Sequence, residues 1–330
     1  MIENSPSTIR WGIVGAGRIA KTFAADIVLA PHASLIAVAS RQLSSAQAFA
    51  DICSVPSAYG SYAEIFADPN VDAIYIATPH SHHKEHAIAA LRAGKHVLCE
   101  KPVTVTPAEL EAVIAVAVEE KRYFMEGMWT YFMPVIQKAL EWVNTGRIGN
   151  LCHVKADFGF PLPYSPDLRE YDIRLAGGCL LEMGIYPIAM AWLFLKKDPD
   201  AQTIWHHKAD NGVEDDVVIL NTYGKNRATA QLTTSFRSKL NNYLTLVGDR
   251  GTLTIANYWA AREVRLYEGS DCVDRFSEER FQQGFNHQIE QVSCDLLAGK
   301  LQIAKFKRYI SLPFWLKRSN VHNNATSCIS

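Results

Sequence analysis

The sequence predicts an α/β fold, in which a domain with a parallel, doubly wound sheet precedes a domain of mixed α+β structure. Two observations favour this class. In the first half, short apolar runs alternate with segments whose apolar residues recur at helical spacing, as in a parallel sheet covered by helices. In the second half, strand-like runs at 214–223, 227–236 and 243–247 follow one another with only turns between them, which predicts antiparallel neighbours. A length of 330 residues suits about two domains.

The first predicted strand leads directly into a glycine motif. Residues 9–14 form an apolar run, the next six are Gly15-Ala16-Gly17-Arg18-Ile19-Ala20, and residues 21–29 have helical spacing. A strand, a tight glycine turn and a helix are the context in which G-x-G-x-x-G/A binds a dinucleotide. Gly15 would permit the turn, and Gly17 would let the backbone approach a pyrophosphate held by the helix N-terminus beside Arg18 and Ile19. The motif therefore predicts a Rossmann domain; the alternative is a chance glycine turn.

The end of the second predicted strand, at 34–40, bears on the choice of cofactor. An NAD site usually places Asp or Glu there, to bind the ribose 2′-hydroxyl. Here the strand ends in Ser40-Arg41-Gln42, and the next acid is Asp51. Arg41 would attract a 2′-phosphate and Ser40 could hydrogen-bond to it, so the sequence favours NADP over NAD. The alternative is that Arg41 only stacks on the adenine.

A histidine-rich segment follows the third predicted strand, at 71–78. Thr78 and Pro79 lead into His80-Ser81-His82-His83-Lys84-Glu85-His86. Four histidines suggest a metal, but the H-E-x-x-H order is missing and Glu85 is the only nearby carboxylate. We interpret the segment as a polar loop and first helical turn beside the cofactor, with Thr78, Pro79, His80 and His83 as candidate contacts and no metal site.

The fourth predicted strand, at 96–99, ends in Glu100-Lys101-Pro102. The carboxyl ends of parallel strands form the edge at which open α/β sheets bind ligands. A lysine there can contact a nicotinamide ribose and a substrate oxygen, and Glu100 borders the same site. The alternative for Lys101 is an ordinary surface lysine.

A later apolar helix, expected at 177–195, carries Glu182 and Tyr186 four residues apart and therefore on one face. Both side chains need polar partners in such a helix. One interpretation is an active-site pair; the other is a core tyrosine and a carboxylate paired with a structural arginine such as Arg174. Its apolar stretch contains Glu182 and Pro187 and is short for a membrane span, so we expect a buried helix.

Composition excludes several classes of protein. Lys and Arg number 33 and Asp and Glu 34, a net charge of −1, which excludes bulk electrostatic attraction to nucleic acid or anionic lipid. Seven scattered cysteines without a C-x-x-C pair favour reduced thiols over a disulfide framework or a four-cysteine zinc site. Residues 1–8 lack an apolar signal core. We therefore expect a cytoplasmic protein without a membrane or nucleic-acid partner.

Three ordered motifs together resemble the glucose–fructose oxidoreductase/inositol dehydrogenase (Gfo/Idh/MocA) family: the glycine motif, Thr78-Pro79-His80 and Glu100-Lys101-Pro102. Segments 125–130 and 177–187 are similar to its branch of dimeric dihydrodiol dehydrogenases and NADP-linked D-xylose dehydrogenases. The resemblance implies an NADP-binding Rossmann domain at 1–126 and a substrate-binding α+β domain at 127–302. The second domain would have an open, mainly antiparallel sheet, whose uncovered face forms a homodimer.

The resemblance also implies the chemistry, which is hydride transfer between NADP and a hydroxyl or carbonyl of a sugar or cyclic diol. It places the acid/base on Tyr186 and the assisting lysine on Lys101, with Glu182 orienting the lysine or a substrate hydroxyl. An ammonium about 4 Å from a phenolate is worth roughly 4 kcal/mol at an effective dielectric of 20, about three pKa units before desolvation. We therefore expect Lys101 to lower the pKa of Tyr186.

The remaining expectations concern the substrate, the rival functions and the tail. We expect aromatic side chains to form a wall against the sugar or diol; the alternative is that they belong to the core. The candidates are Trp129, Phe158, Trp259 and Phe285. The alternatives to a dehydrogenase are a non-catalytic NAD(P)-binding regulator and a C=C (enone or biliverdin-type) reductase.

Residues 303–330 are basic and then polar and depart from the family pattern. The explanations are divergence, an altered reading frame or a solvated tail.

Overall fold

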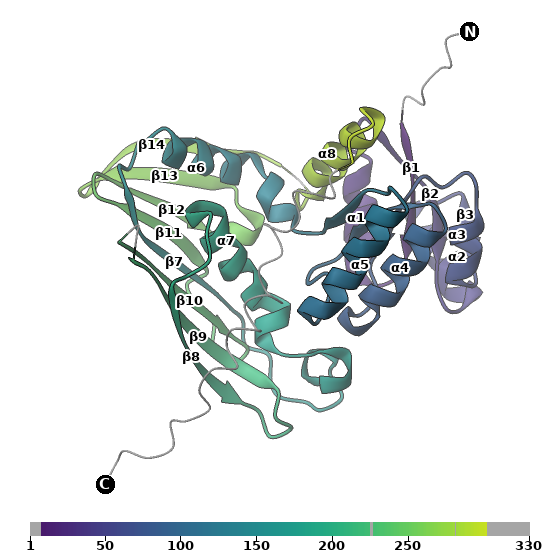
Figure 1. Ribbon diagram of the computed structural model, residues 1–330, viewed down its shortest axis with the longest axis horizontal. Helices are drawn as coiled ribbons and strands as arrows, with labels where there is room; N and C mark the ends of the chain where they lie inside the picture. Colours follow the sequence, from purple (N-terminus) through teal and green to yellow (C-terminus); the bar gives the residue numbers. More distant parts are fainter. Residues whose placement is uncertain (1–7, 225–226, 281, 302–330) are drawn as a thin grey trace.

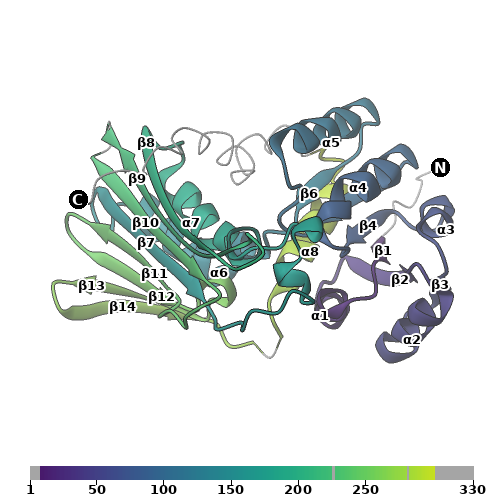
Figure 2. The same cartoon turned by 90° about the horizontal axis from the view of Figure 1, so that it is seen from below.

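The computed structural model describes residues 8–224, 227–280 and 282–301, and these form two units, each built on one sheet (Figures 1 and 2). The expectations for the tail at 303–330 lie outside the described residues. The two units confirm the predicted α/β class. The division of the chain between residues 126 and 127 stays a prediction.

The N-terminal unit is a six-stranded sheet in the order β3-β2-β1-β4-β5-β6, and every neighbouring pair is parallel. The strands are β1 (Ile9–Val14), β2 (Ala33–Ala39), β3 (Ser57–Tyr59), β4 (Ala73–Ile76), β5 (His96–Cys99) and β6 (Phe124–Glu126). The helices are α1 (Arg18–Ile27), α2 (Leu43–Cys53), α3 (Tyr62–Ala67), α4 (His83–Arg92) and α5 (Pro107–Glu119). The strand order reverses between β1 and β4, which is the point where a Rossmann sheet binds its dinucleotide.

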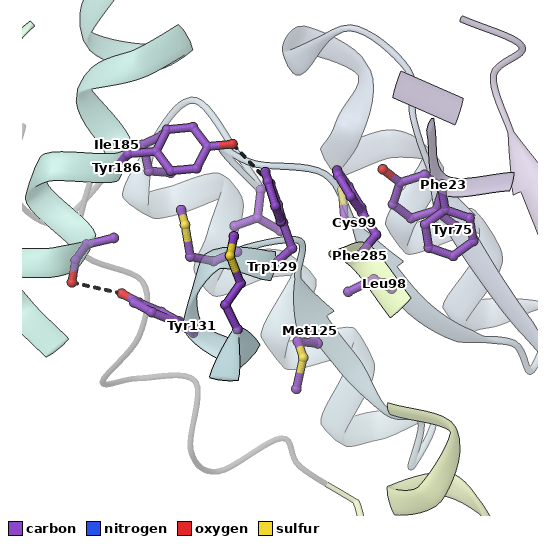
Figure 3. Packing of buried hydrophobic residues seen from close by; sticks show 14 of the residues in the cluster. Phe23, Tyr75, Leu98, Cys99, Met125, Trp129, Tyr131, Ile185, Tyr186 and Phe285 are labelled. Atoms are coloured by element: carbon purple, nitrogen blue, oxygen red, sulfur yellow. Dashed lines mark hydrogen bonds between the residues drawn. The ribbon is translucent and has the colours of Figure 1, made fainter. Parts of the chain in front are cut away.

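The predicted strands of this unit match closely, whereas helix starts shift. The strands expected at 9–14 and 96–99 have these bounds. The helix expected at 21–29 begins three residues earlier, and α4 begins at His83, within the histidine-rich segment. The core that supports the sheet includes Phe23 stacked on Tyr75, with ring centroids 3.8 Å apart (Figure 3). The backbone after α4 turns at Gly94, whose φ of +79° favours glycine.

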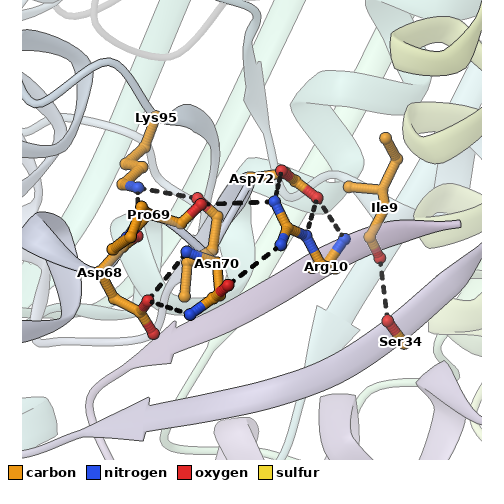
Figure 4. A network of polar contacts seen from close by, with 9 residues as sticks. Ile9, Arg10, Ser34, Asp68, Pro69, Asn70, Asp72 and Lys95 are labelled. Atoms are coloured by element: carbon orange, nitrogen blue, oxygen red, sulfur yellow. Dashed lines mark hydrogen bonds and ion pairs between the residues drawn. The ribbon is translucent and has the colours of Figure 1, made fainter. Parts of the chain in front are cut away.

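A polar network closes the amino ends of β1 and β4, at the edge away from the glycine turn (Figure 4). Arg10 Nη2 lies 2.7 Å from Asp72 Oδ1, and Lys95 donates to the carbonyls of Asp68 and Val71 at 2.6 and 2.8 Å. These contacts provide the buried ammonium of Lys95 with hydrogen-bond partners. The opposite edge, at the carboxyl ends of the strands, stays open.

The C-terminal unit is an eight-stranded sheet in the order β14-β13-β12-β11-β7-β10-β9-β8. Its strands are β7 (Leu151–Gly159), β8 (Ala201–Lys208), β9 (Glu214–Tyr223), β10 (Ala228–Ser235), β11 (Tyr243–Gly248), β12 (Thr252–Ala256), β13 (Glu263–Glu268) and β14 (Asp271–Ser277). All neighbours are antiparallel except β7 and β10, so the expected mainly antiparallel sheet is confirmed.

Helices cover one face of this sheet. α6 (Pro134–Asn144) lies against β13 and β14, and α7 (Ile185–Leu195) lies against β7 and β10 (Figure 2). Along β9, residues such as Val217 and Ile219 are buried, whereas the alternate Val218 and Leu220 are about 40% exposed. Within residues 8–224, 227–280 and 282–301, the second face is therefore open.

The predicted helix at 177–195 begins at Cys179 and contains a π-helical segment, Leu180–Gly184, before α7. A π-helix carries its hydrogen bonds one residue further than an α-helix and is frequent at functional sites. The segment Ile173–Leu195 is long and apolar enough to cross a membrane, but 83% of its most apolar window is buried within the protein. It is the core helix of this unit, as expected from the sequence.

The last described helix, α8 (Phe285–Leu297), returns to the N-terminal unit, where it lies beside α1 and β1 (Figure 1). Asp26 on α1 is fully buried, and its Oδ2 accepts the backbone N–H groups of Gly284 and Phe285 at 2.8 and 2.7 Å. A carboxylate from one helix thus caps the N-terminus of the other and fixes where α8 begins.

Candidate active site

The glycine turn after β1 is shaped for a pyrophosphate. Gly15 has φ +101°, and a Cβ there would lie 2.8 Å from the carbonyl oxygen of Ala77, so no larger residue fits. A Cβ on Gly17 would meet no atom within 4 Å. Gly17 gives α1 no side-chain cap, and the first turn of α1 has no acidic residue, so its N–H groups face outward beside exposed Arg18 and half-buried Ile19.

The end of β2 carries a hydroxyl group and a cation and no carboxylate. Ser40 is half-buried and its backbone N–H donates to the carbonyl of Tyr59 at 3.2 Å. Arg41 is exposed next to it, close enough to Tyr62 to act on that hydroxyl electrostatically. The nearest acid downstream, Asp51, lies near the end of α2 and pairs with Gln47. The charge at this edge is therefore positive.

His83 joins two loops of the site. Its Nε2 lies 2.7 Å from the carbonyl oxygen of Thr78 and its Nδ1 lies 2.9 Å from that of Pro102. The ring is fully buried, and burial lowers its pKa to about 4. The neutral ring carries one N–H and donates it to one of these two carbonyls, and His83 packs between the loop after β4 and the loop after β5. A direct contact between His83 and a cofactor stays a prediction.

Thr78 and His80 have different surroundings. Thr78 Oγ1 lies 3.0 Å from Nδ1 of His86, and Pro79 begins the short turn His80–His82. His80 is buried and its Nδ1 lies 3.7 Å from Oε1 of Glu182, too far for a hydrogen bond. Burial, together with His83 and Lys101, lowers the pKa of His80, so its ring is neutral. It faces the segment that bears the predicted acid/base.

Two buried carboxyl groups lie beneath the loop after β5. Glu100 accepts the hydroxyl of Tyr75 through Oε1 and the backbone N–H of Lys101 through Oε2, the latter at 3.1 Å. Glu126 accepts the N–H of Val103 at 2.9 Å. Burial raises the pKa of both, and that of Glu126 to about 7. Two buried carboxyl groups near each other favour holding one proton between them, because two negative charges are costly without water.

Lys101 and Tyr186 meet across the two units. Lys101 follows β5, Tyr186 is in the first turn of α7, and Nζ lies 5.2 Å from the centre of the tyrosine ring. Nζ also donates to the backbone carbonyl of Glu182 at 2.8 Å. The hydroxyl of Tyr186 accepts from Nε1 of Trp129 at 3.1 Å (Figure 3). The predicted meeting of amine and phenol is present in the structure.

The electrostatics of Tyr186 differ from the expectation. Burial raises its pKa above that of free tyrosine, and the negative charges of Glu100 and Glu182 add to the increase. The ammonium of Lys101 is bonded to a carbonyl rather than to the hydroxyl, so the expected lowering is absent. Tyr186 is consequently a neutral phenol at neutral pH, able to donate a proton.

Glu182 has two roles through two different groups. Its backbone carbonyl orients Lys101, and its carboxylate pairs with Arg169, Nη1 to Oε1 2.6 Å. The structural arginine that the sequence suggested, Arg174, is wrong, because it pairs with Asp172 at 2.8 Å. Arg169 begins a short 3₁₀ helix, Arg169–Tyr171, and its neighbours in sequence gave no signal of this contact.

The four predicted aromatic residues form two stacked pairs around Tyr186. Trp129 stacks on Phe285 with centroids 4.6 Å apart, and Phe158 stacks on Trp259 at 4.1 Å. Trp129, Phe158 and Phe285 are buried, so they support the site from behind, while Trp259 is partly exposed. A further aromatic residue, Phe160, was not predicted from the sequence; it is 40% exposed and packs edge-on against Trp259.

Comparisons with known proteins agree on one family. Residues 9–128 match the model of an "Oxidoreductase family, NAD-binding Rossmann fold", and residues 136–254 match the "GFO/IDH/MocA C-terminal domain". The chain is 38% identical to mouse trans-1,2-dihydrobenzene-1,2-diol dehydrogenase over 78% of its own length and 77% of the relative's. It is 33% identical to the D-xylose 1-dehydrogenase (NADP(+)) of Hypocrea jecorina, over 72% and 68%.

A solved structure has the same arrangement of both units. The aldose-aldose oxidoreductase of Caulobacter crescentus, crystallised with glycerol, superposes with a TM-score of 0.85 at 25% identity. The match covers 94% of this chain and 96% of that one, so the likeness extends over the sheets of both units.

The raised pKa of Glu126 predicts a specific dependence of stability on pH. A carboxyl group with a pKa of about 7 in the folded chain and 4.5 when unfolded stabilises the fold fully below pH 4.5 and loses this contribution as pH rises through 7. We expect Glu126→Gln, compared with the wild type, to gain on the order of 2–3 kcal/mol of unfolding free energy between pH 5 and pH 8.

Urea denaturation at the two pH values measures this gain. The exposed Glu111 on α5 provides the matched control, since Glu111→Gln should show no such change. An equal difference between Glu126→Gln and wild type at both pH values would contradict the assignment.

Proposed function

The chain belongs to the Gfo/Idh/MocA oxidoreductase family, and from this premise we propose that it is an NADP-dependent enzyme acting on a hydroxyl or carbonyl of a sugar or cyclic diol. The nicotinamide would exchange a hydride with the substrate carbon, while Tyr186, assisted by Lys101, exchanges the proton with the substrate oxygen. The observation that carries the proposal is the contact between Lys101 and Tyr186, from separate units, at the carboxyl edge of the parallel sheet.

Proton transfer is the task that the surroundings of Tyr186 support. In reduction, a neutral phenol donates its proton to the oxygen as the carbonyl becomes an alcohol. Because burial and the nearby carboxylates keep Tyr186 protonated, the geometry favours this direction in the free enzyme. Oxidation needs the phenolate, which a positive charge on Lys101 stabilises once water is excluded.

The support for NADP comes from the end of β2 and from the relatives. Arg41 and Ser40 provide a cation and a donor for a 2′-phosphate, without a carboxylate to repel it. One relative is named as an NADP-dependent xylose dehydrogenase. The glycine turn and the uncapped N-terminus of α1 would hold the pyrophosphate.

The support for a sugar or diol is the partly exposed aromatic surface. Trp259 and Phe160 offer ring faces to a carbon ring, and hydroxyl groups would meet Lys101 and Tyr186. The names of the relatives cover both substrate classes, an arene dihydrodiol and an aldose.

We also propose that two copies pair through the open face of the C-terminal sheet. Trp205 on β8 and Val218 on β9 are cross-strand partners, 55% and 40% exposed, and Leu220 and Tyr243 extend the apolar surface. Such a patch favours burial against a second copy.

We further propose a cytoplasmic location. Reduced thiols fit it: the six cysteines in the part of the chain that the structure describes are all free.

Removing the acid/base or its lysine should abolish chemistry without abolishing cofactor binding. We expect Tyr186→Phe and Lys101→Met each to lower kcat by at least about a hundredfold, because proton transfer is lost. NADPH affinity, measured by fluorescence titration, should change little. Tyr164→Phe, at an exposed ring, is the control. Near-normal turnover of either variant on a panel of aldoses and diols would refute these roles.

Cofactor choice should depend on Arg41. We expect Arg41→Ala to raise the KM for NADP at least about tenfold and to leave that for NAD nearly unchanged, because only the 2′-phosphate loses its partner. Arg92→Ala, at the exposed end of α4, should affect neither. A wild-type enzyme that prefers NAD would contradict the proposal.

The molar mass of the protein in solution tests whether two copies pair. Light scattering should give twice the chain mass of 36.8 kDa for the wild type and a shift to monomer for Leu220→Arg, which places a charge in the apolar face. Ile52→Arg, at an exposed apolar residue of α2, should stay dimeric. A monomeric wild type would show that the open face does not join two chains.

A further inference from the structure

A cluster of three metal-ligand side chains, none of which belongs to the proposed active site, lies where α8 meets the loop between α1 and β2. His32 comes from that loop, and Glu290 and Cys294 lie one turn apart on α8. His32 Nδ1 is 2.5 Å from Glu290 Oε1, and Cys294 Sγ is 3.3 Å from the same oxygen and 3.7 Å from the histidine nitrogen. Segments about 260 residues apart in sequence thus converge on one point.

The three atoms nearly outline one face of a tetrahedron around zinc. With Zn–N and Zn–O bonds of about 2.1 Å and a Zn–S bond of about 2.3 Å, sulfur would lie about 3.6 Å from each of the other ligands. The observed 3.7 and 3.3 Å are close to this value. The nitrogen and the oxygen would need to part to about 3.4 Å, since a hydrogen bond now joins them.

The carboxylate is already held in place by its second oxygen. Glu290 Oε2 accepts the backbone N–H of His32 at 3.0 Å, which directs Oε1 toward the histidine ring and the thiol. The side chains of His32 and Glu290 are 47% and 28% exposed, so solvent reaches the cluster. A metal ion can therefore enter, and water can take the fourth position.

We propose that His32, Glu290 and Cys294 bind a zinc ion. A thiolate and a carboxylate balance the two positive charges, and a neutral imidazole completes a set of soft and borderline ligands that favours zinc over magnesium or calcium. Binding releases the thiol proton to solvent as the Zn–S bond forms, and the imidazole proton moves from Nδ1 to Nε2 through solvent as Nδ1 binds the metal, with no change of oxidation state. The ion would add a metal link between α8 and the N-terminal unit, where hydrogen bonds between His32 and Glu290 already join them.

Cobalt substitution tests the site because a cysteine thiolate on Co²⁺ gives a charge-transfer band in the near ultraviolet. We expect one equivalent of Co²⁺ to produce this band in the full-length reduced protein, and Zn²⁺ to displace it and to raise Tm. Cys294→Ser should lose the band, and His32→Gln and Glu290→Gln should weaken zinc affinity at least about tenfold in competition with a chromophoric chelator.

Cys272→Ser, which removes an exposed cysteine on β14, is the matched control and should keep the band and the affinity. Circular dichroism of each variant verifies its fold, and His32→Gln tests the site even if Cys294→Ser is unstable. The absence of a band in the wild type would overturn the proposal and leave a hydrogen-bonded trio. A band that survives Cys294→Ser would overturn it too, by assigning the metal to another thiol.

Discussion

The hydrogen bond from Lys101 Nζ to the carbonyl of Glu182 is the contact on which the proposed site depends. It joins the carboxyl end of β5 to the π-helical segment before α7, and so it joins the two units at one point. The same bond places the ammonium 5.2 Å from the ring of Tyr186. Trp129 fixes the phenol from the opposite side, through a hydrogen bond and its stack on Phe285. Amine and phenol are thus positioned by backbone and aromatic packing, before any ligand binds.

Burial, with too few cations to balance the carboxylates, explains the raised pKa values around this contact. Glu100, Glu126 and Glu182 surround the loop after β5, and Arg169 neutralises only the last of them. Burial therefore raises the pKa values of the first two, which hold one proton between them, and the pKa of Tyr186 is raised by its own burial and by the negative charge that remains on this group. A bound cofactor and substrate would replace water in this region and change the balance. The low local dielectric makes the site responsive to one added charge, which is a common property of acid/base sites.

Much of the fold and part of the site were predictable from local sequence. Strands β1 and β5 have the predicted bounds, because a short apolar run between a polar residue and a glycine or charged motif permits few alternatives. The glycine turn at Gly15 and the place of Lys101 after a strand follow from local motifs for the same reason, whereas the acid/base role of Tyr186 came from the resemblance to the family and stays a prediction. The parallel pairing of β7 with β10, the position of α8 and the role of Arg169 were not found, since they depend on segments distant in sequence.

By itself, therefore, the sequence determined the alternation of strands and helices in the first half of the chain, the glycine turn, the cation at the end of β2 and the candidates for acid/base chemistry. Only the tertiary structure decided that Lys101 bonds to a carbonyl, that Tyr186 is a neutral phenol, and that His83 joins two loops. It also decided that His32 meets Glu290 and Cys294. The physical reason is that motifs act within a few residues, whereas pKa values and ligand sets depend on which distant side chains share a space without water.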